Sequence, residues 1–207
     1  MIDVLVLDYG AGNLRSVVRA VQRVGGDPLI SDRAQDLREA RAVIMPGVGA
    51  AADTMRNLAA HGLVEPVREY IASGRPFLGV CMGLQALLTA SEENGRQPCL
   101  DVIPGTVRRL PEGQKVPHMG WNTVHQARPH AIFDGVPDGS YFYFVHSYHV
   151  EPDDESWIIA ETEYGRRFPA ALARDHIVAT QFHPEKSGEH GLRIYANFLA
   201  AIPAAVR

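Results

Sequence analysis

The sequence predicts an α/β protein with a central, mostly parallel sheet, helices on both faces of that sheet and an additional antiparallel region. Short apolar runs alternate with helical patterns from residue 4 to residue 88, which is typical of a parallel sheet covered by helices. From residue 100 to residue 180, short strand-like runs are separated by turn residues, which indicates antiparallel or mixed strands. The 207 residues contain no linker, repeat or low-complexity segment. We therefore expect a single domain over residues 1–207.

The composition is that of an ordinary globular enzyme. Hydrophobic residues make up 46% of the chain and charged residues 21%, and the formal net charge is −4. This balance does not favour nucleic acid or an anionic membrane as a partner. The first residues do not resemble a signal peptide, and no run approaches the ~18 apolar residues of a membrane span. The two cysteines and the histidines show no disulfide or metal-site spacing, so we expect a cytoplasmic protein without a metal or other cofactor.

In the N-terminal half, each expected strand is followed by a helical pattern. The expected strands cover residues 4–7, 28–30, 42–45 and 77–80. The expected helices run from Asn13 to Gly25, from the small residues after Gly49 to His61, from Leu63 to Gly74, and from the residues after Cys81 through Leu88.

Two glycine-rich loops, at residues 8–13 and 46–50, follow the first and third of these strands. The first loop has Arg15 where a dinucleotide fingerprint needs a third small residue. The second matches that fingerprint but is followed by a helix where the fingerprint needs an acidic residue after the next strand. Exposed backbone N–H groups in the second loop are better suited to an oxyanion hole beside a nucleophile.

In the C-terminal half, we expect strands over residues 141–150, 157–160 and 177–182, a turn at 174–176 and a closing helix over 192–199. His146 and His149 are expected to be hydrogen-bonded structural residues. Residues 115–122 place Met and Trp beside Pro and Gly, and we expect a loop there. Such a loop either packs onto the core or forms a partner-binding surface, where Trp and Met are enriched.

The stretch Gly79-Val80-Cys81-Met82-Gly83 has the pattern of a nucleophile elbow. In an elbow the nucleophile occupies a sharp strand-to-helix corner, and the flanking glycines avoid collisions that a Cβ would make. A neighbouring imidazolium and the start of the following helix favour the thiolate form of such a cysteine. Cys99 lacks these surroundings, and we expect it to be inert.

His183 and Glu185 follow the last expected strand, and Pro184 ends the pairing of that strand. Residues two apart on an extended segment face the same way, so this pair can act as a base and its orienting carboxylate. Taken alone, the tripeptide is typical of an ordinary loop; together with the elbow, it indicates a Cys81-His183-Glu185 triad. The N–H groups of Met82 and of Gly49, in the Val48–Gly49 loop, are the expected oxyanion donors.

Residues 79–85 and 181–185 together resemble the signature of class I (triad) glutamine amidotransferases. Within that superfamily, residues 8–14, 46–49, 117–122 and 144–148 are similar to the glutaminase subunits of imidazole glycerol phosphate synthases. The resemblance implies hydrolysis of L-glutamine to glutamate and ammonia through a cysteine thioester. The ammonia would pass through a channel to a separate cyclase subunit with a (β/α)8 barrel. That subunit would make imidazole glycerol phosphate and an aminoimidazole carboxamide ribotide in histidine biosynthesis.

The same resemblance implies roles for further residues. Gln85 would contact the amino-acid end of the substrate, assisted by backbone at Gly49, Ser147 and Tyr148. The residues facing the partner in a heterodimer would be Asn13, Met119, Trp121 and Tyr143. Two other hypotheses remain. One keeps the triad and makes the protein a stand-alone cysteine hydrolase of the γ-glutamyl hydrolase or peptidase type; the other is a non-catalytic nucleotide-binding α/β module that uses the glycine loops.

Overall fold

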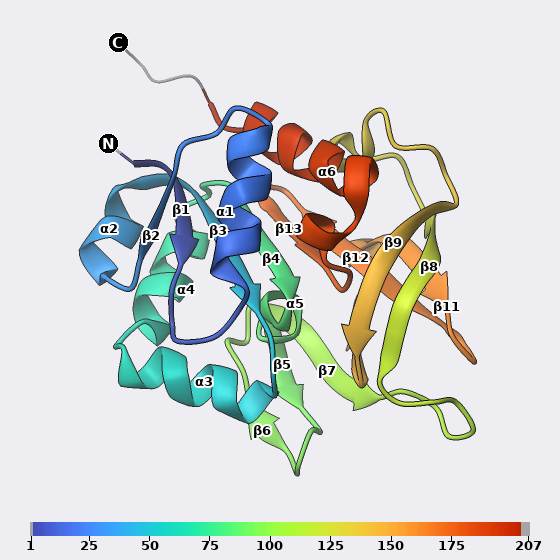
Figure 1. Cartoon of the computed structure of the whole chain (residues 1–207). Coiled ribbons are helices and arrows are strands. Elements are labelled where there is room, and N and C mark those ends of the chain that lie inside the picture. The colour runs from blue at the N-terminus through green and yellow to red at the C-terminus, as the bar shows by residue number, and fades with distance from the viewer. Residues whose placement is uncertain (1, 204–207) are drawn as a thin grey trace.

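The computed structural model describes residues 2–203 and contains a nine-stranded mixed sheet flanked by helices (Figure 1). The strand order is β2-β1-β3-β4-β13-β12-β11-β8-β9. The first five strands of this order are mutually parallel and the remaining pairs are antiparallel, as the sequence predicts. The strands are β1 (Ile2–Leu7), β2 (Pro28–Ser31), β3 (Ala40–Gly47), β4 (Phe77–Cys81), β8 (His118–Gln126), β9 (Ser140–His146), β11 (Ile158–Glu163), β12 (Arg167–Arg174) and β13 (Ile177–Thr180).

Helices cover both faces of the large sheet. Strand β1 shows why: Val4 and Val6 pack with helices α1 (Leu14–Arg23) and α6 (Gly188–Ala200), whereas Leu5 and Leu7 pack with the helices of the opposite face. Because successive side chains on a strand point to opposite faces, a run that is apolar throughout needs cover on both sides. The opposite face carries α2 (Ala34–Glu39), which the sequence analysis did not predict, together with α3 (Ala51–Ala60) and α4 (Val64–Ala72).

A second, four-stranded sheet packs on the face that carries α4. Its order is β10-β7-β5-β6, formed by β10 (Tyr148–Pro152), β7 (Ile103–Arg109), β5 (Leu88–Ser91) and β6 (Gln97–Pro98). The expected helix from Cys81 through Leu88 is therefore wrong. Helix α5 is a single turn (Met82–Gln85), and Leu88 begins a strand. The backbone N–H of Leu100 donates to Ala86, and further pairing between residues 87–88 and 101–103 continues the strand-like path.

Residues 118–126 form a strand, so the expected loop at 115–122 is wrong for most of its length. Strand β8 pairs with the edge strand β9, and Trp121 lies opposite Tyr143. Alternation places His118 inside, whereas Met119 and Trp121 are 63% and 55% exposed, so these two side chains do not pack onto the core.

The expected single strand over 141–150 is divided at Ser147. Strand β9 pairs with β8 as far as His146, and the chain then crosses to the second sheet, where Tyr148 pairs with Arg109 on β7. The turn between the two sheets therefore falls at Ser147. Aromatic content alone did not reveal this crossing, because both strands are rich in the same residue types.

Three short 3-10 turns complete the fold: η1 (Ala131–Phe133), η2 (Glu155–Trp157) and η3 (Pro184–Lys186). Trp157 lies in η2 rather than in the strand expected from residue 157. Within residues 2–203, every helix is too short or too polar to cross a lipid bilayer.

Candidate active site

Cys81 occupies a strained corner between β4 and α5. Its φ of 55° and ψ of −103° lie outside the backbone regions that residues other than glycine ordinarily adopt. Such a backbone conformation lowers the stability of the fold by about 1–3 kcal/mol. A Cβ on Gly79 would lie 2.7 Å from the Gly83 carbonyl oxygen, and a Cβ on Gly83 would lie 2.0 Å from that of Met45. The flanking glycines thus allow the close packing that holds the elbow in place.

The glycine loop after β3 lies directly beside this elbow, because the parallel register pairs Gly47 with Cys81. A Cβ on Gly47 would lie 2.4 Å from the Tyr9 hydroxyl and 2.6 Å from the Met82 Cβ. The Tyr9 hydroxyl donates to the Pro46 carbonyl at 2.7 Å. Burial raises the pKa of Tyr9, which keeps the hydroxyl protonated as a donor. The register therefore brings the Val48–Gly49 loop to the nucleophile.

His183 and Glu185 form a buried pair. The His183 Nδ1–H donates to Glu185 Oε1 at 2.8 Å, and both side chains are 2% exposed. The expected pairing is present, but its expected geometry is wrong: Glu185 lies in the turn η3 and not on an extended segment. Burial alone would lower the pKa of His183, but its interactions with Cys81 and Glu185 outweigh burial and raise the pKa. The imidazolium form is thus favoured beside the sulfur.

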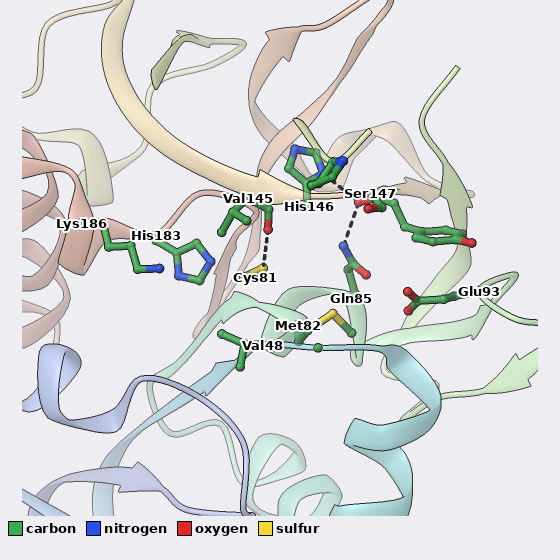
Figure 2. Close-up of a pocket in the computed structure, with 13 residues that line it drawn as sticks. Val48, Cys81, Met82, Gln85, Glu93, Val145, His146, Ser147, His183 and Lys186 are labelled. Atoms are coloured by element: carbon green, nitrogen blue, oxygen red, sulfur yellow. Dashed lines mark hydrogen bonds between the residues drawn. The ribbon is translucent and has the colours of Figure 1, made fainter. Parts of the chain in front are cut away.

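A pocket of about 360 Å³ lies in front of Cys81 (Figure 2). The residues expected to form the oxyanion hole and to bind the substrate line this pocket together with Cys81 and His183. Glu185 does not line the pocket and contacts the imidazole at Nδ1. The lining residues are Val48, Gly49, Cys81, Met82, Gln85, Glu93, Pro117, Val145, His146, Ser147, Tyr148, His183 and Lys186.

The sequence analysis did not single out two charged residues of this pocket. Glu93 Oε2 accepts from the backbone N–H of Ala51 at 2.8 Å, at the start of α3. No motif contains Glu93, because the pairing of β5 with β7 brings it to the site. Lys186 directly follows the triad tripeptide, and its ammonium lies 5.5 Å from the centre of the Tyr143 ring. Proximity to His183 in the sequence was the available signal for Lys186.

Three of the expected partner-facing side chains lie on β8 and β9: Met119 and Trp121 are exposed, and Tyr143 is half-buried. The Trp121 and Tyr143 rings meet edge to face, with centroids 6.2 Å apart, and Met119 lies on the same face of β8. Asn13 is exposed at the start of α1.

Cys99 packs against Met82 and Ala51, is 3% exposed and is not among the residues that line the pocket. Burial raises its pKa to about 11, which keeps it a thiol at neutral pH. Among the side chains of residues 2–203, no three His, Cys, Asp or Glu converge as a metal ion would require.

The family "Glutamine amidotransferase class-I" matches residues 5–202 of this sequence. Solved structures agree on the fold. A glutamine amidotransferase superposes with a TM-score of 0.74, at 21% identity and over 95% of this chain and 98% of the other. PurLQS from Thermotoga maritima superposes with a TM-score of 0.76, at 16% identity and over 98% of this chain and all of the other. Fold and family match together define a class I glutamine amidotransferase, an enzyme class in which the Cys-His-Glu triad is characteristic.

Relatives with higher sequence identity identify the family within this class. A protein from Chloroflexus aurantiacus is 52% identical over 95% of this chain and 94% of its own length. Proteins from Herpetosiphon aurantiacus and Dehalococcoides mccartyi are 50% and 46% identical, over 95% and 94% of this chain and 93% and 95% of their own lengths. All three are described as imidazole glycerol phosphate synthase subunit HisH. The chain therefore belongs to the HisH family of glutamine amidotransferases, and a stand-alone hydrolase is not favoured.

Proposed function

We propose that this chain is the glutaminase subunit of imidazole glycerol phosphate synthase and that Cys81, His183 and Glu185 are its catalytic residues. The observation that carries the proposal is the convergence of a strained cysteine elbow and a buried His–Glu pair on one pocket. The Cys81 thiolate attacks the side-chain amide carbon of L-glutamine. His183 protonates the leaving ammonia, and the acyl group remains on sulfur as a thioester. His183 then activates a water molecule that releases glutamate.

The tetrahedral intermediates of both steps carry an oxyanion. The backbone N–H groups of Met82 and Gly49 are the proposed donors to it, because the β3–β4 register places both beside Cys81. Removing one such donor in other hydrolases costs about 2.7–4 kcal/mol of transition-state stabilisation.

Residues of the same pocket are proposed to bind the amino-acid end of the glutamine substrate. Gln85 has its amide nitrogen bound to two protein acceptors, which leaves its amide oxygen for the α-ammonium group of glutamine. Glu93 adds a negative charge for the same ammonium. Backbone at Ser147 and Tyr148 lines the wall where the amino-acid end would lie.

The partner is the cyclase subunit, for which we propose a (β/α)8 barrel in a heterodimer in the cytoplasm. The relatives are described as synthase subunits, and the exposed aromatic and apolar side chains of β8 and β9 offer an interface. We propose that Asn13, Met119, Trp121 and Tyr143 contact the cyclase, that ammonia crosses this interface, and that residues 1–207 act as one amidotransferase domain.

The decisive experiment measures glutamate release with and without the cyclase and its nucleotide ligand. The wild-type chain should be stimulated by the cyclase. Cys81→Ala should abolish glutamine hydrolysis while the complex still makes its products from added ammonia. Glutamate release by Cys81→Ala at the wild-type rate would refute the assignment of the nucleophile.

A further inference from the structure

Gln181 contacts the nucleophile, although the mechanism above gives it no role. Gln181 lies in the sequence between the end of β13 and His183, and its side chain is fully buried. Its Nε2 donates to Cys81 Sγ at 3.7 Å, and its Oε1 accepts from Gln85 Nε2 at 3.0 Å. Only the nitrogen end of this amide can stabilise a thiolate, because the oxygen end would place partial negative charge against the sulfur. Which end faces Cys81 therefore matters for catalysis.

The carbonyl of Tyr148 fixes that choice. A carbonyl oxygen only accepts hydrogen bonds, so the Gln85 side-chain atom that lies 2.8 Å from it must be the nitrogen. The second N–H of the same nitrogen then donates to Gln181, which must present its oxygen to Gln85. Gln181 is left with its nitrogen toward Cys81.

The same carbonyl is held from the other side by a pair of buried histidines. His146 Nδ1 lies 2.9 Å from the Tyr148 oxygen and must carry the proton. Its Nε2 is therefore an acceptor when the ring is neutral, and His118 Nδ1, at 2.9 Å, must donate to it. Burial lowers the pKa of His118 to about 4 and that of His146 to about 3, in agreement with two neutral rings.

The donor and acceptor roles at the outer end of this series of hydrogen bonds, at Asn122, are fixed independently. His118 Nε2 is left as an acceptor and faces Asn122 Nδ2 at 3.3 Å. The Asn122 amide is oriented by the backbone: its oxygen accepts from Thr123 N–H at 2.8 Å, and its nitrogen donates to the Glu163 carbonyl at 2.8 Å. Donor and acceptor roles thus agree at every step from strand β8 to the nucleophile.

We propose that Gln181 stabilises the Cys81 thiolate by donating a hydrogen bond to it, and that the neutral His118–His146 pair holds the Tyr148 carbonyl that sets this donor direction. The proposal rests on the proposed function, in which Cys81 is the nucleophile. His118 and His146 act here as positioning residues. Their strand β8 also carries Met119 and Trp121 on its exposed face.

The test measures iodoacetamide alkylation of Cys81 against pH by mass spectrometry of the Cys81 peptide. Gln181→Met keeps the length of the side chain but removes the donor. A hydrogen bond to a charged group corresponds to about one pH unit or more, so the alkylation profile should move to higher pH and kcat in the cyclase complex should fall roughly tenfold. The matched control is Gln126→Met, since Gln126 Nε2 donates to the Val136 carbonyl away from the pocket. It should leave profile and kcat unchanged.

A Gln181→Met protein that folds and keeps the wild-type profile would overturn the proposal. A wild-type complex that releases no glutamate from glutamine would instead refute the proposed function. A second measurement needs no substitution: the imidazole ¹⁵N shifts of the wild-type chain should show His118 and His146 protonated at Nδ1 and bare at Nε2. A proton on Nε2 of His146 would leave Nδ1 with no proton to donate to the Tyr148 carbonyl, and it would overturn the positioning role of the histidine pair even if Gln181→Met fails to fold.

Discussion

The strain at the elbow can be measured by comparing alanine with glycine at the position of the nucleophile. Cys81 has φ 55° and ψ −103°, so an alanine there keeps the strained Cβ whereas a glycine does not. Ala86, five residues on, has an ordinary φ of −64° and ψ of −20°, and both residues are buried, Cys81 at 4% exposure and Ala86 at 0%. The two positions therefore differ mainly in backbone conformation.

The expected magnitudes follow from this difference. At position 86, replacing alanine by glycine loses about 0.4–1 kcal/mol through the greater freedom of the unfolded chain and about 0.8 kcal/mol of methyl burial. The same two losses apply between Cys81→Ala and Cys81→Gly, but the relief of about 1–3 kcal/mol of strain opposes them. We expect the change to cost about 1.5 kcal/mol at position 86 and to be neutral or slightly stabilising at position 81.

Urea denaturation of the four proteins, followed by circular dichroism, measures these free energies of unfolding. The wild type and Ala86→Gly form one pair, and Cys81→Ala and Cys81→Gly form the other. An equal cost of glycine in both pairs would show that the elbow stores no strain. Neither Cys81 variant should hydrolyse glutamine. If Cys81→Gly is more stable than Cys81→Ala, the wild-type protein gives up stability to hold the nucleophile in a strained position.

Three other perturbations have defined outcomes. Glu93→Gln removes the pocket carboxylate charge but keeps an acceptor for the Ala51 N–H; KM for glutamine should rise about tenfold with a smaller change in kcat, and an unchanged KM would exclude an ammonium contact. The pKa values of His118 and His146 are lowered by burial, so the unfolded chain takes up protons first as pH falls below about 6.5. The free energy of unfolding should then drop by about 1–2 kcal/mol per histidine by pH 5. In urea titrations at several pH values, this drop should be smaller for His118→Phe than for the wild type. Trp121→Ala should weaken cyclase binding or stimulation while the melting temperature stays within a few degrees; unchanged affinity and stimulation would contradict an interface role.

The elbow and the His–Glu pair could be predicted because local sequence determines them. Gly79 and Gly83 occupy positions where a Cβ would meet backbone at 2.7 Å and 2.0 Å, so the geometry requires these residue types and leaves a pattern. The pairing of His183 with Glu185 was predicted from the wrong backbone geometry. A spacing of two residues brings both side chains to one site in an extended segment and, here, also across the first turn of a 3-10 helix.

The second sheet and part of the pocket could not be predicted, because long-range pairing creates them. The spacing of Leu84, Leu87 and Leu88 fits a helix, yet Leu88 pairs with Ile103 and begins β5. Glu93 reaches the pocket only because this pairing turns the chain back toward α3. Gln181 was visible in the signature of residues 181–185, but its contact with the sulfur depends on Gln85, which is 96 residues away in the sequence.

Strand β8 shows how one alternating segment serves two surfaces. Met119 and Trp121 point outward, while His118 points inward and donates to His146 on the neighbouring strand. Met119 pairs with Val145, whose carbonyl oxygen lies 3.9 Å from Cys81 Sγ. A slip of one residue in the β8–β9 register would turn the exposed apolar side chains inward and break the histidine pair. The same slip would also move the Val145 carbonyl relative to Met119, so one register fixes both the exposed apolar side chains and the carbonyl beside the nucleophile.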